Sequence, residues 1–185
     1  MKKGINVLLI LMLTCLSSAN LKTGTLYKVV KGSIQFNSDA PLELIKASSD
    51  ELAGLFDTDK KSFAFRIKVN SFKGFNGALQ KEHFNENYME SSKFPYASFE
   101  GKVIEDIDYN TPGNYSVRAK GNLSVHGVTQ ERIIKVNLIV KKNQINAQSA
   151  FSVMLADHNI TIPKVVHEKL ASEIKVEINA DLVTP

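Results

Sequence analysis

Hydrophobic and polar residues alternate with a period of two along much of this 185-residue chain. The alternation is clearest over residues 63–69, 115–126 and 173–180. In residues 63–69, Phe, Phe, Ile and Val occupy the odd positions, and Ala, Arg and Lys occupy the even ones. Neighbouring side chains of a β-strand point to opposite faces, so this spacing predicts strands with one buried and one solvated face.

Five further segments alternate less regularly and are also predicted to be strands. They are residues 25–37, 41–48, 97–104, 131–141 and 144–157. Gly, Asn, Asp and Pro mark the breaks, as in residues 57–59 and 110–113. Eight strands at hairpin-like spacing predict an all-β fold with antiparallel pairing. A two-sheet sandwich or a closed barrel would hide their apolar faces, and periodicity alone does not choose between the two.

One segment, residues 77–89, lacks the strand pattern and predicts a short helix. It is rich in helix-forming residues at its start and contains no β-branched residue. Phe84 and Tyr88 are four residues apart, so they would share one face of the helix. Asn76 is a candidate N-cap, and Pro95 returns the chain to an extended conformation.

The first 19 residues have the features of a secretory signal peptide. Lys2 and Lys3 precede an apolar run over residues 5–16, which is short for a membrane span, and Ser17 and Ala19 supply small residues before a cleavage site. We therefore predict an exported protein, periplasmic or secreted, whose single domain covers residues 20–185. A buried N-terminal strand or helix is the alternative interpretation of this segment.

The single cysteine, Cys15, lies within the predicted signal peptide. A lipoprotein anchored through Cys15 is the alternative localisation, although Leu13 and Thr14 fit a lipoprotein signal poorly. After ordinary cleavage the mature chain would contain no thiol, which excludes disulfides and cysteine catalysis.

Composition and charge narrow the class of partner. The chain is 43% hydrophobic and 23% charged, with a formal net charge of +4 that falls when Lys2 and Lys3 leave with the signal peptide. The remaining charges are nearly balanced and scattered, so no nucleic-acid partner is expected.

The sequence contains no recognisable catalytic or metal-binding motif. The four histidines, His83, His126, His158 and His167, do not have the spacing of a zinc site. Asp57 and Asp59 lack the glycine and closing glutamate of a calcium loop and are predicted to form a turn. No nucleophile elbow, phosphate loop or dinucleotide fingerprint is present, so we predict no enzyme activity, metal or cofactor.

Two blocks of sequence resemble the YceI-like family. Residues 71–101 look like its signature region, which ends in a phrase that reads Lys93-Phe94-Pro95-Tyr96-Ala97-Ser98-Phe99 here. Residues 115–129 are similar to a second family phrase, which reads Gly121-Asn122-Leu123-Ser124-Val125-His126-Gly127-Val128-Thr129 here. Residues 151–178 resemble the closing strands, although His158 and Asn159 depart from the family pattern. The resemblance covers residues 25–180.

The resemblance implies an antiparallel, eight-stranded, extended β-barrel that is lipocalin-like and has an apolar pore. Some members of the family hold a polyisoprenoid or a similar long-chain amphiphile in this pore, and many are exported. Residues 72–77 replace a more polar family phrase, so head-group contacts in that loop do not transfer to this chain.

From the resemblance and the aromatic residues we predict a carrier or sequestering protein for an apolar lipid or isoprenoid. A buried CH₂ group contributes about 0.8 kcal/mol, so a long tail needs no strong polar anchor. The candidate ligand-binding residues are Phe63, Phe65, Phe72, Phe75, Phe84, Tyr88, Phe94 and Phe99. Such a carrier is expected to contact a membrane surface transiently, and the sequence leaves the oligomeric state open.

Two other functions remain open at this point. Each aromatic residue taken singly is expected to fill the core, and a barrel packed solid in this way would be a structural or interaction protein. An enzyme acting on an apolar substrate would instead need two or more acidic or histidine side chains inside the pocket.

Overall fold

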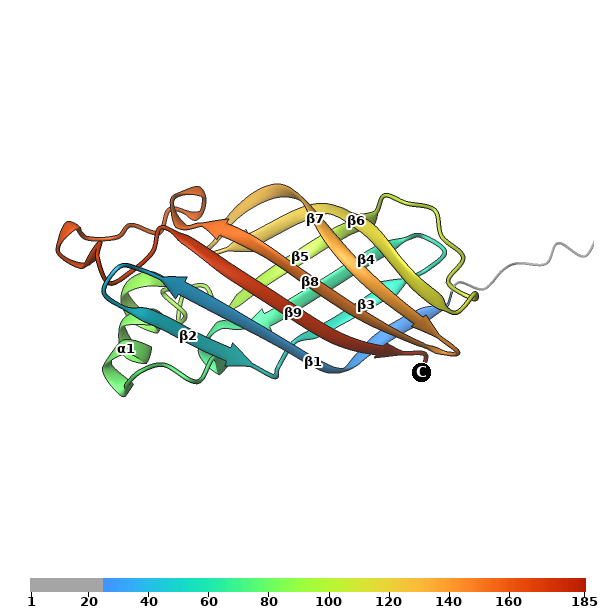
Figure 1. The fold of residues 1–185 in the computed structure, drawn as a ribbon, viewed down its shortest axis with the longest axis horizontal. Helices are drawn as coiled ribbons and strands as arrows, with labels where there is room; N and C mark the ends of the chain where they lie inside the picture. Colours follow the sequence, from blue (N-terminus) through green and yellow to red (C-terminus); the bar gives the residue numbers. More distant parts are fainter. Residues whose placement is uncertain (1–24) are drawn as a thin grey trace, which may run out of the picture.

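The computed structural model describes residues 25–185, which form a long barrel of tilted strands (Figure 1). The predicted signal peptide and Cys15 lie outside the described residues. Within residues 25–185, no helix is long and apolar enough to cross a membrane. The strands are β1 (Leu26–Asp39), β2 (Leu44–Ser49), β3 (Ala53–Asp57), β4 (Ser62–Lys68), β5 (Tyr96–Val103), β6 (Gly113–Val125), β7 (Val128–Lys141), β8 (Gln144–Met154) and β9 (Glu173–Val183).

The sheet closes on itself because β1 pairs with β9, and every strand pairing is antiparallel. The strands β2 and β3 lie one after the other along the same edge of β1: β2 pairs with residues 34–39, and β3 pairs with residues 26–28. The described strands therefore occupy eight positions around the ring, which confirms the predicted eight-stranded barrel. The strand that the sequence did not reveal is β3, whose inward positions are Gly54 and Phe56.

A bulge in β1 changes which residues face the interior. Tyr27 and Val29, before the bulge in the sequence, are buried, whereas Ile34 and Phe36, after the bulge, face inwards. The register with β9 shifts between Val29 and Lys31, which adds one residue to β1 and reverses its alternation. This reversal explains why residues 25–37 show a weak period of two although they form one continuous strand.

The predicted helix is confirmed. It consists of α1 (Ala78–His83), which continues directly into a wider π-helical turn, η2 (Phe84–Tyr88). The N-cap is Gly77, so the prediction that Asn76 caps the helix is wrong. The Asn76 side chain instead donates hydrogen bonds to Glu43 Oε1 and to the Leu44 carbonyl, which attaches the start of the helix to the β1–β2 turn.

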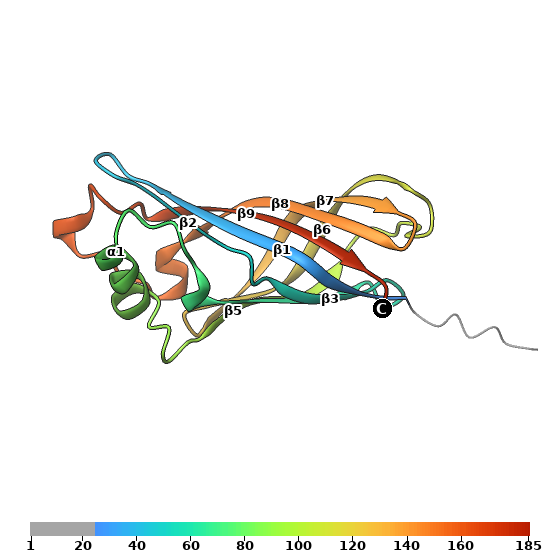
Figure 2. The ribbon, with the colours of Figure 1, turned by 90° about the horizontal axis from the view of Figure 1, so that it is seen from below.

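The helix fills a gap in the barrel wall. Strand β4 ends at Lys68, and after a short turn, η1 (Val69–Ser71), the chain crosses to β2, where Lys73 and Ser48 exchange backbone hydrogen bonds. The chain does not return to the barrel as a strand until β5 begins. Residues 69–95 therefore cover one side of the barrel at the end where α1 lies, which we call the helix end (Figure 2).

The opposite end, which we call the loop end, is covered by the loop between β5 and β6. In this loop Tyr109 is buried, and its ring packs edge-on against Phe56 with centroids 5.2 Å apart. Burial, with smaller contributions from Asp106 and Glu105, raises the pKa of Tyr109 to about 12, so the ring stays neutral at physiological pH. The loop is fixed to the barrel by Glu105, which accepts a hydrogen bond from Arg118 Nε at 2.7 Å.

The backbone ladder between β7 and β8 is incomplete. Residues 137–141 of β7 pair with residues 144–148 of β8, and beyond these residues the two strands separate. Side chains bridge the separated part. Arg132 Nη2 donates to the Ser152 carbonyl at 2.8 Å, and Ser149 Oγ donates to the Lys135 carbonyl at 2.7 Å. Two turns at the helix end close the split, because His158 Nδ1 lies 3.0 Å from the Val128 carbonyl oxygen.

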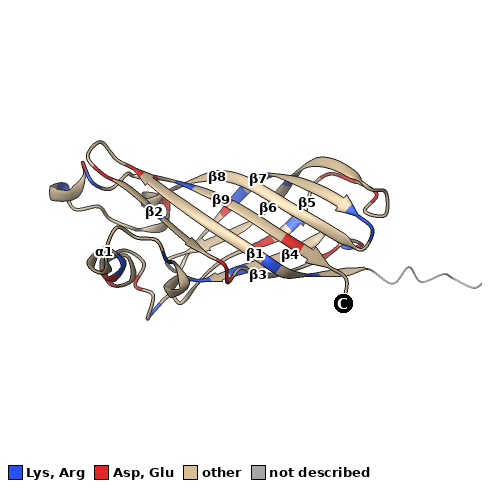
Figure 3. Cartoon of the chain, turned by 60° about the horizontal axis from the view of Figure 1, so that its bottom comes forward, with Lys and Arg blue, Asp and Glu red and all other residues tan. Residues whose placement is uncertain are grey.

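Charged residues of both signs are interspersed along the strands and loops (Figure 3). Within residues 25–185, the ion pairs that lysine and arginine form lie at the surface, for example Lys60 with Asp57 and Lys120 with Glu131. Such exposed pairs contribute little to stability. The fold therefore depends on the apolar inner face of the barrel and on the hydrogen-bonded ladders.

The close approach of β5 and β6 generates the first prediction. Gly101 lies directly opposite Gly121, and a Cβ atom on Gly101 would overlap the Lys120 carbonyl oxygen and the Gly121 backbone. We expect Gly101→Ala to destabilise the fold by about 1–3 kcal/mol, the usual cost of overpacking, measured as the free energy of unfolding in urea. The control is Gly77→Ala, because a Cβ there meets no atom within 4 Å, and the change of N-cap residue should cost less than about 1 kcal/mol. Equal effects of both substitutions would contradict this account of the β5–β6 contact.

Candidate ligand-binding cavity

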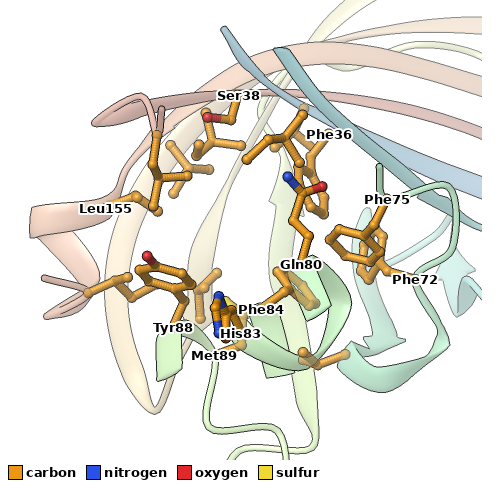
Figure 4. Close-up of a pocket in the computed structure, with 18 of the residues that line it drawn as sticks. Phe36, Ser38, Phe72, Phe75, Gln80, His83, Phe84, Tyr88, Met89 and Leu155 are labelled. Atoms are coloured by element: carbon orange, nitrogen blue, oxygen red, sulfur yellow. The ribbon is translucent and has the colours of Figure 1, made fainter. Parts of the chain in front are cut away.

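A cavity of about 600 Å³ occupies the helix end of the barrel (Figure 4). Its walls come from the inner faces of the strands and from the helix, and they are mainly apolar. The aliphatic residues that line it are Ile34, Ile45, Ile67, Val69, Leu79, Ala97, Leu123, Val125, Val153, Leu155, Ile160, Val166, Leu170, Ile174 and Val176. Protein interiors normally leave few voids larger than a water molecule, so a cavity of this size is a specific feature of the fold.

A cluster of four phenylalanines forms the wall between the helix and β1. Phe84 from η2 stacks on Phe36 from β1, with ring centroids 5.4 Å apart and planes 18° apart. Phe72 and Phe75 pack against both rings at centroid distances of 5.0–6.0 Å. These contacts hold the helix against the barrel and give one side of the cavity an aromatic surface.

Four of the eight predicted ligand-binding residues line this large cavity: Phe72, Phe75, Phe84 and Tyr88. Three others, Phe63, Phe65 and Phe99, line a second, smaller cavity of about 100 Å³ nearer the loop end. Phe151 lines both cavities.

The eighth predicted residue, Phe94, lies in neither cavity. Its ring packs edge-on against His126, with centroids 4.9 Å apart, and lies over Gly127 at the β6–β7 turn. Phe94 precedes Pro95 and β5, so it lies outside the strand that would have turned it inwards. Its contacts are therefore structural, and they support the turn from outside the barrel interior.

Sequence reasoning missed most of the cavity wall. It named aromatic residues, whereas the wall is largely aliphatic and also includes Phe36 and Phe151. The alternation over residues 173–180 did mark Ile174 and Val176 as inward-facing, so these two could have been named. Phe36 could not, because the bulge in β1 hides its orientation.

Polar groups gather where the helix meets the β1–β2 turn. The Glu43 carboxylate accepts hydrogen bonds from Gln80 Nε2 at 2.8 Å and Asn76 Nδ2 at 3.3 Å, and Gln80 Oε1 accepts from the Asn76 backbone N–H at 3.0 Å. His83 and Lys169 also line the cavity and are exposed to solvent. The cavity thus combines an apolar interior with a polar rim, an arrangement suited to an amphiphile.

A second polar contact fixes the far end of the helix. Glu90 Oε2 lies 2.7 Å from His126 Nε2, and the other ring nitrogen of His126 lies 3.0 Å from the His158 carbonyl oxygen. Both ring nitrogens of His126 therefore face oxygen atoms. The contact joins the segment after η2 to two turns at the helix end.

The described residues contain no group of three or more His, Cys, Asp or Glu side chains arranged to hold a metal ion. His158 is fully buried, and its Nε2 has no hydrogen-bond partner within residues 25–185. Its Nδ1 faces the Val128 carbonyl, so the ring closes the barrel wall and does not line either cavity.

A family model described as the YceI-like domain matches residues 22–182. The chain belongs to the YceI-like domain family. This confirms the resemblance seen in the sequence. No curated protein matches the chain.

Three solved structures show the same fold at low sequence identity. A polyisoprenoid binding domain from Saccharophagus degradans, implicated in plant cell wall breakdown, is 16% identical with a TM-score of 0.73, over 86% of this chain and 98% of that one. BcnA from Burkholderia cenocepacia is 14% identical with a TM-score of 0.66, over 81% and 95%. The YceI protein of Campylobacter jejuni is 15% identical with a TM-score of 0.61, over 76% and 85%.

The phenylalanine cluster generates a prediction for this YceI-like domain. We expect Phe84→Ala to destabilise the protein by about 2–3 kcal/mol, somewhat below the cost for a fully buried ring, because Phe84 is half-buried. The backbone amides of residues 78–88 should also exchange with deuterium faster, since the helix loses its stacking partner. In the control, Leu79→Ala, the side chain is 62% exposed and exchange should stay close to wild type. Unchanged exchange in Phe84→Ala would show that other contacts hold the helix.

Proposed function

We propose that this protein binds an amphiphile with a long apolar tail, such as a polyisoprenoid, and carries or sequesters it. The observation that carries the proposal is the cavity of about 600 Å³ with mainly apolar walls. Pockets of roughly 300–1,000 Å³ with apolar walls and a few polar groups are typical of small-molecule sites. A barrel that served only as a structural or interaction module would gain stability by filling this space.

The physical chemistry of the cavity favours a tail over a polar ligand. Apolar walls offer water few hydrogen-bond partners, so a tail that enters the cavity displaces only weakly held water. Each buried CH₂ group contributes about 0.8 kcal/mol, and the gain grows with tail length. The polar head would remain near Glu43, Gln80, His83 and Lys169, where solvent is accessible.

The fold relatives supply the ligand class for this proposal. The Saccharophagus degradans protein is described as a polyisoprenoid binding domain, and its fold extends over 86% of this chain. Export, expected from residues 1–19, is part of the same proposal, because a carrier outside the cytoplasm would meet lipids at membrane surfaces. An enzymatic function has less support, because Glu43 and His83, the acidic and histidine residues that line the cavity, lie at its rim, and the Glu43 carboxylate is engaged by Gln80 and Asn76.

The absence of tryptophan from the sequence makes a direct binding test possible. In Phe75→Trp, a single indole would replace a ring of the cavity wall, and we expect farnesol or a longer prenyl alcohol to shift its emission to the blue in a saturable way. The control is Tyr96→Trp, because Tyr96 lies outside both cavities and is 47% exposed. A shift of equal size in both variants, or in neither, would contradict binding in the cavity.

Transient contact with a membrane surface is a further part of the proposal. Leu42, Leu79 and Val165 are 67%, 62% and 88% exposed, and they lie on the three segments around the cavity at the helix end. The β1–β2 hairpin and the loop that contains η4 (Lys164–Val166) are joined at the helix end, because the Leu42 N–H donates to the Glu168 carbonyl at 2.8 Å. These apolar side chains would enter a bilayer surface and spare the tail a passage through water.

We expect Leu42→Ser combined with Val165→Ser, two exposed residues that line neither cavity, to slow the transfer of a prenyl alcohol from phosphatidylcholine vesicles at least about tenfold, since the combined loss of apolar contact exceeds the 1.4 kcal/mol that a factor of ten requires. Affinity for the free alcohol should be unchanged. The matched control is Val30→Ser combined with Ile133→Ser, which removes exposed side chains from the barrel wall. If both double variants slowed transfer equally, contact through the helix end would be disproved.

A further inference from the structure

The large and the small cavity are two chambers of the barrel interior, and they meet at one position along the barrel axis. On β9, Val176 lines the large cavity and Ile178 the small one, and on β5, Ala97 lines the large cavity and Phe99 the small one. Among the described residues, Phe151 is the one side chain that lines both cavities. The boundary therefore passes through Phe151 on one side of the barrel and lies at Phe99 on the other.

Aromatic rings are concentrated at this boundary. Phe99 and Phe65 are direct cross-strand neighbours on β5 and β4, and the Phe99 ring also packs on Phe63 at a centroid distance of 4.9 Å. Gly54, opposite Phe65 on β3, leaves the space that the Phe65 ring occupies, because a Cβ there would overlap that ring. The Phe65 ring on β4 therefore packs directly over Gly54 of the neighbouring strand β3.

Phe151, on β8, packs against the same apolar cluster as Phe99. The buried side chains of this small cluster are Leu123, Val153 and Val176. Phe151 lies opposite Val176 on β9, so its ring points into the barrel. The space beyond is only about 100 Å³, compared with about 600 Å³ in front of it.

We infer that Phe151 and Phe99 form the floor of the ligand chamber and determine the longest tail that the protein accepts. This inference rests on the proposed function and adds its specificity determinant. A tail that reaches the floor can extend further only by displacing packed rings, which close-packed interiors resist. Affinity should therefore rise by about fourfold per CH₂ group until the tail reaches the floor, and should then stop rising.

The test measures affinity against tail length with straight-chain primary alcohols, by native mass spectrometry of the mature protein. The wild type should show a break point in this series. Phe151→Ala joins the two chambers and should move the break to longer alcohols. Ala97→Phe places a ring in front of the floor and should move the break to shorter ones. Phe56→Leu enlarges the space beyond the floor and leaves the floor intact, so its break should match the wild type.

The opposite directions expected for Phe151→Ala and Ala97→Phe separate a change of floor from general destabilisation, which would weaken all alcohols alike. A wild-type break that neither substitution moves would overturn the inference and leave the proposed function standing. Affinity that rises through the whole series without a break would overturn it as well. A wild type that binds no alcohol of any length would overturn the proposed function and the inference together.

Discussion

The ladder between β1 and β9 is the interaction on which the rest of the structure depends. It closes the sheet by pairing the first described strand with the last, over residues 28–37 and 175–183, so neither long strand is left as a free edge. Once the ring is closed, the apolar faces of eight strand positions must enclose a common interior. At the loop end that interior is filled by large side chains, including Phe56 and the neutral ring of Tyr109. Closure thus provides both a solid core and the rigid wall that an internal cavity requires.

The cavity arises because one side of the barrel wall contains no strand at the helix end. Strand β4 ends at Lys68 while β1 continues to Asp39, so one side of the barrel lacks a strand where β1 and β2 extend furthest. The segment that covers this side contains the helix of residues 78–88. The stacked pair Phe36 and Phe84 fixes the distance between this helix and β1, and the space behind them remains open. Stability at this end therefore comes from aromatic contacts and from the Glu43 and Glu90 hydrogen bonds.

Alternation in most strands predicted an all-β fold with antiparallel pairing, and the resemblance to the YceI-like family then chose the closed barrel over a sandwich. Sequence reasoning missed β3, where glycine occupies an inward position and only Phe56 carries the pattern, and it weakened at β1, where a bulge reverses the alternation. For the cavity it identified aromatic residues but could not tell which rings face open space. Phe63 and Phe72 look alike in sequence, yet one lines the small chamber and the other the large one. That difference depends on where the strands end and on long-range pairing, which alternation does not encode. Phe94 shows the same limit, because the residue before Pro95 leaves the strand.

The central claim is that the large cavity exists to hold an apolar tail. The most direct measurement compares the native and denatured masses of residues 20–185. The protein is purified without detergent after cells have exported it. The account predicts an excess native mass that is lost on denaturation, with a prenyl or acyl lipid in the organic extract. A native mass equal to that of the polypeptide, unchanged after incubation with isoprenoids and fatty acids, would contradict it and would favour a barrel that acts through its outer surface.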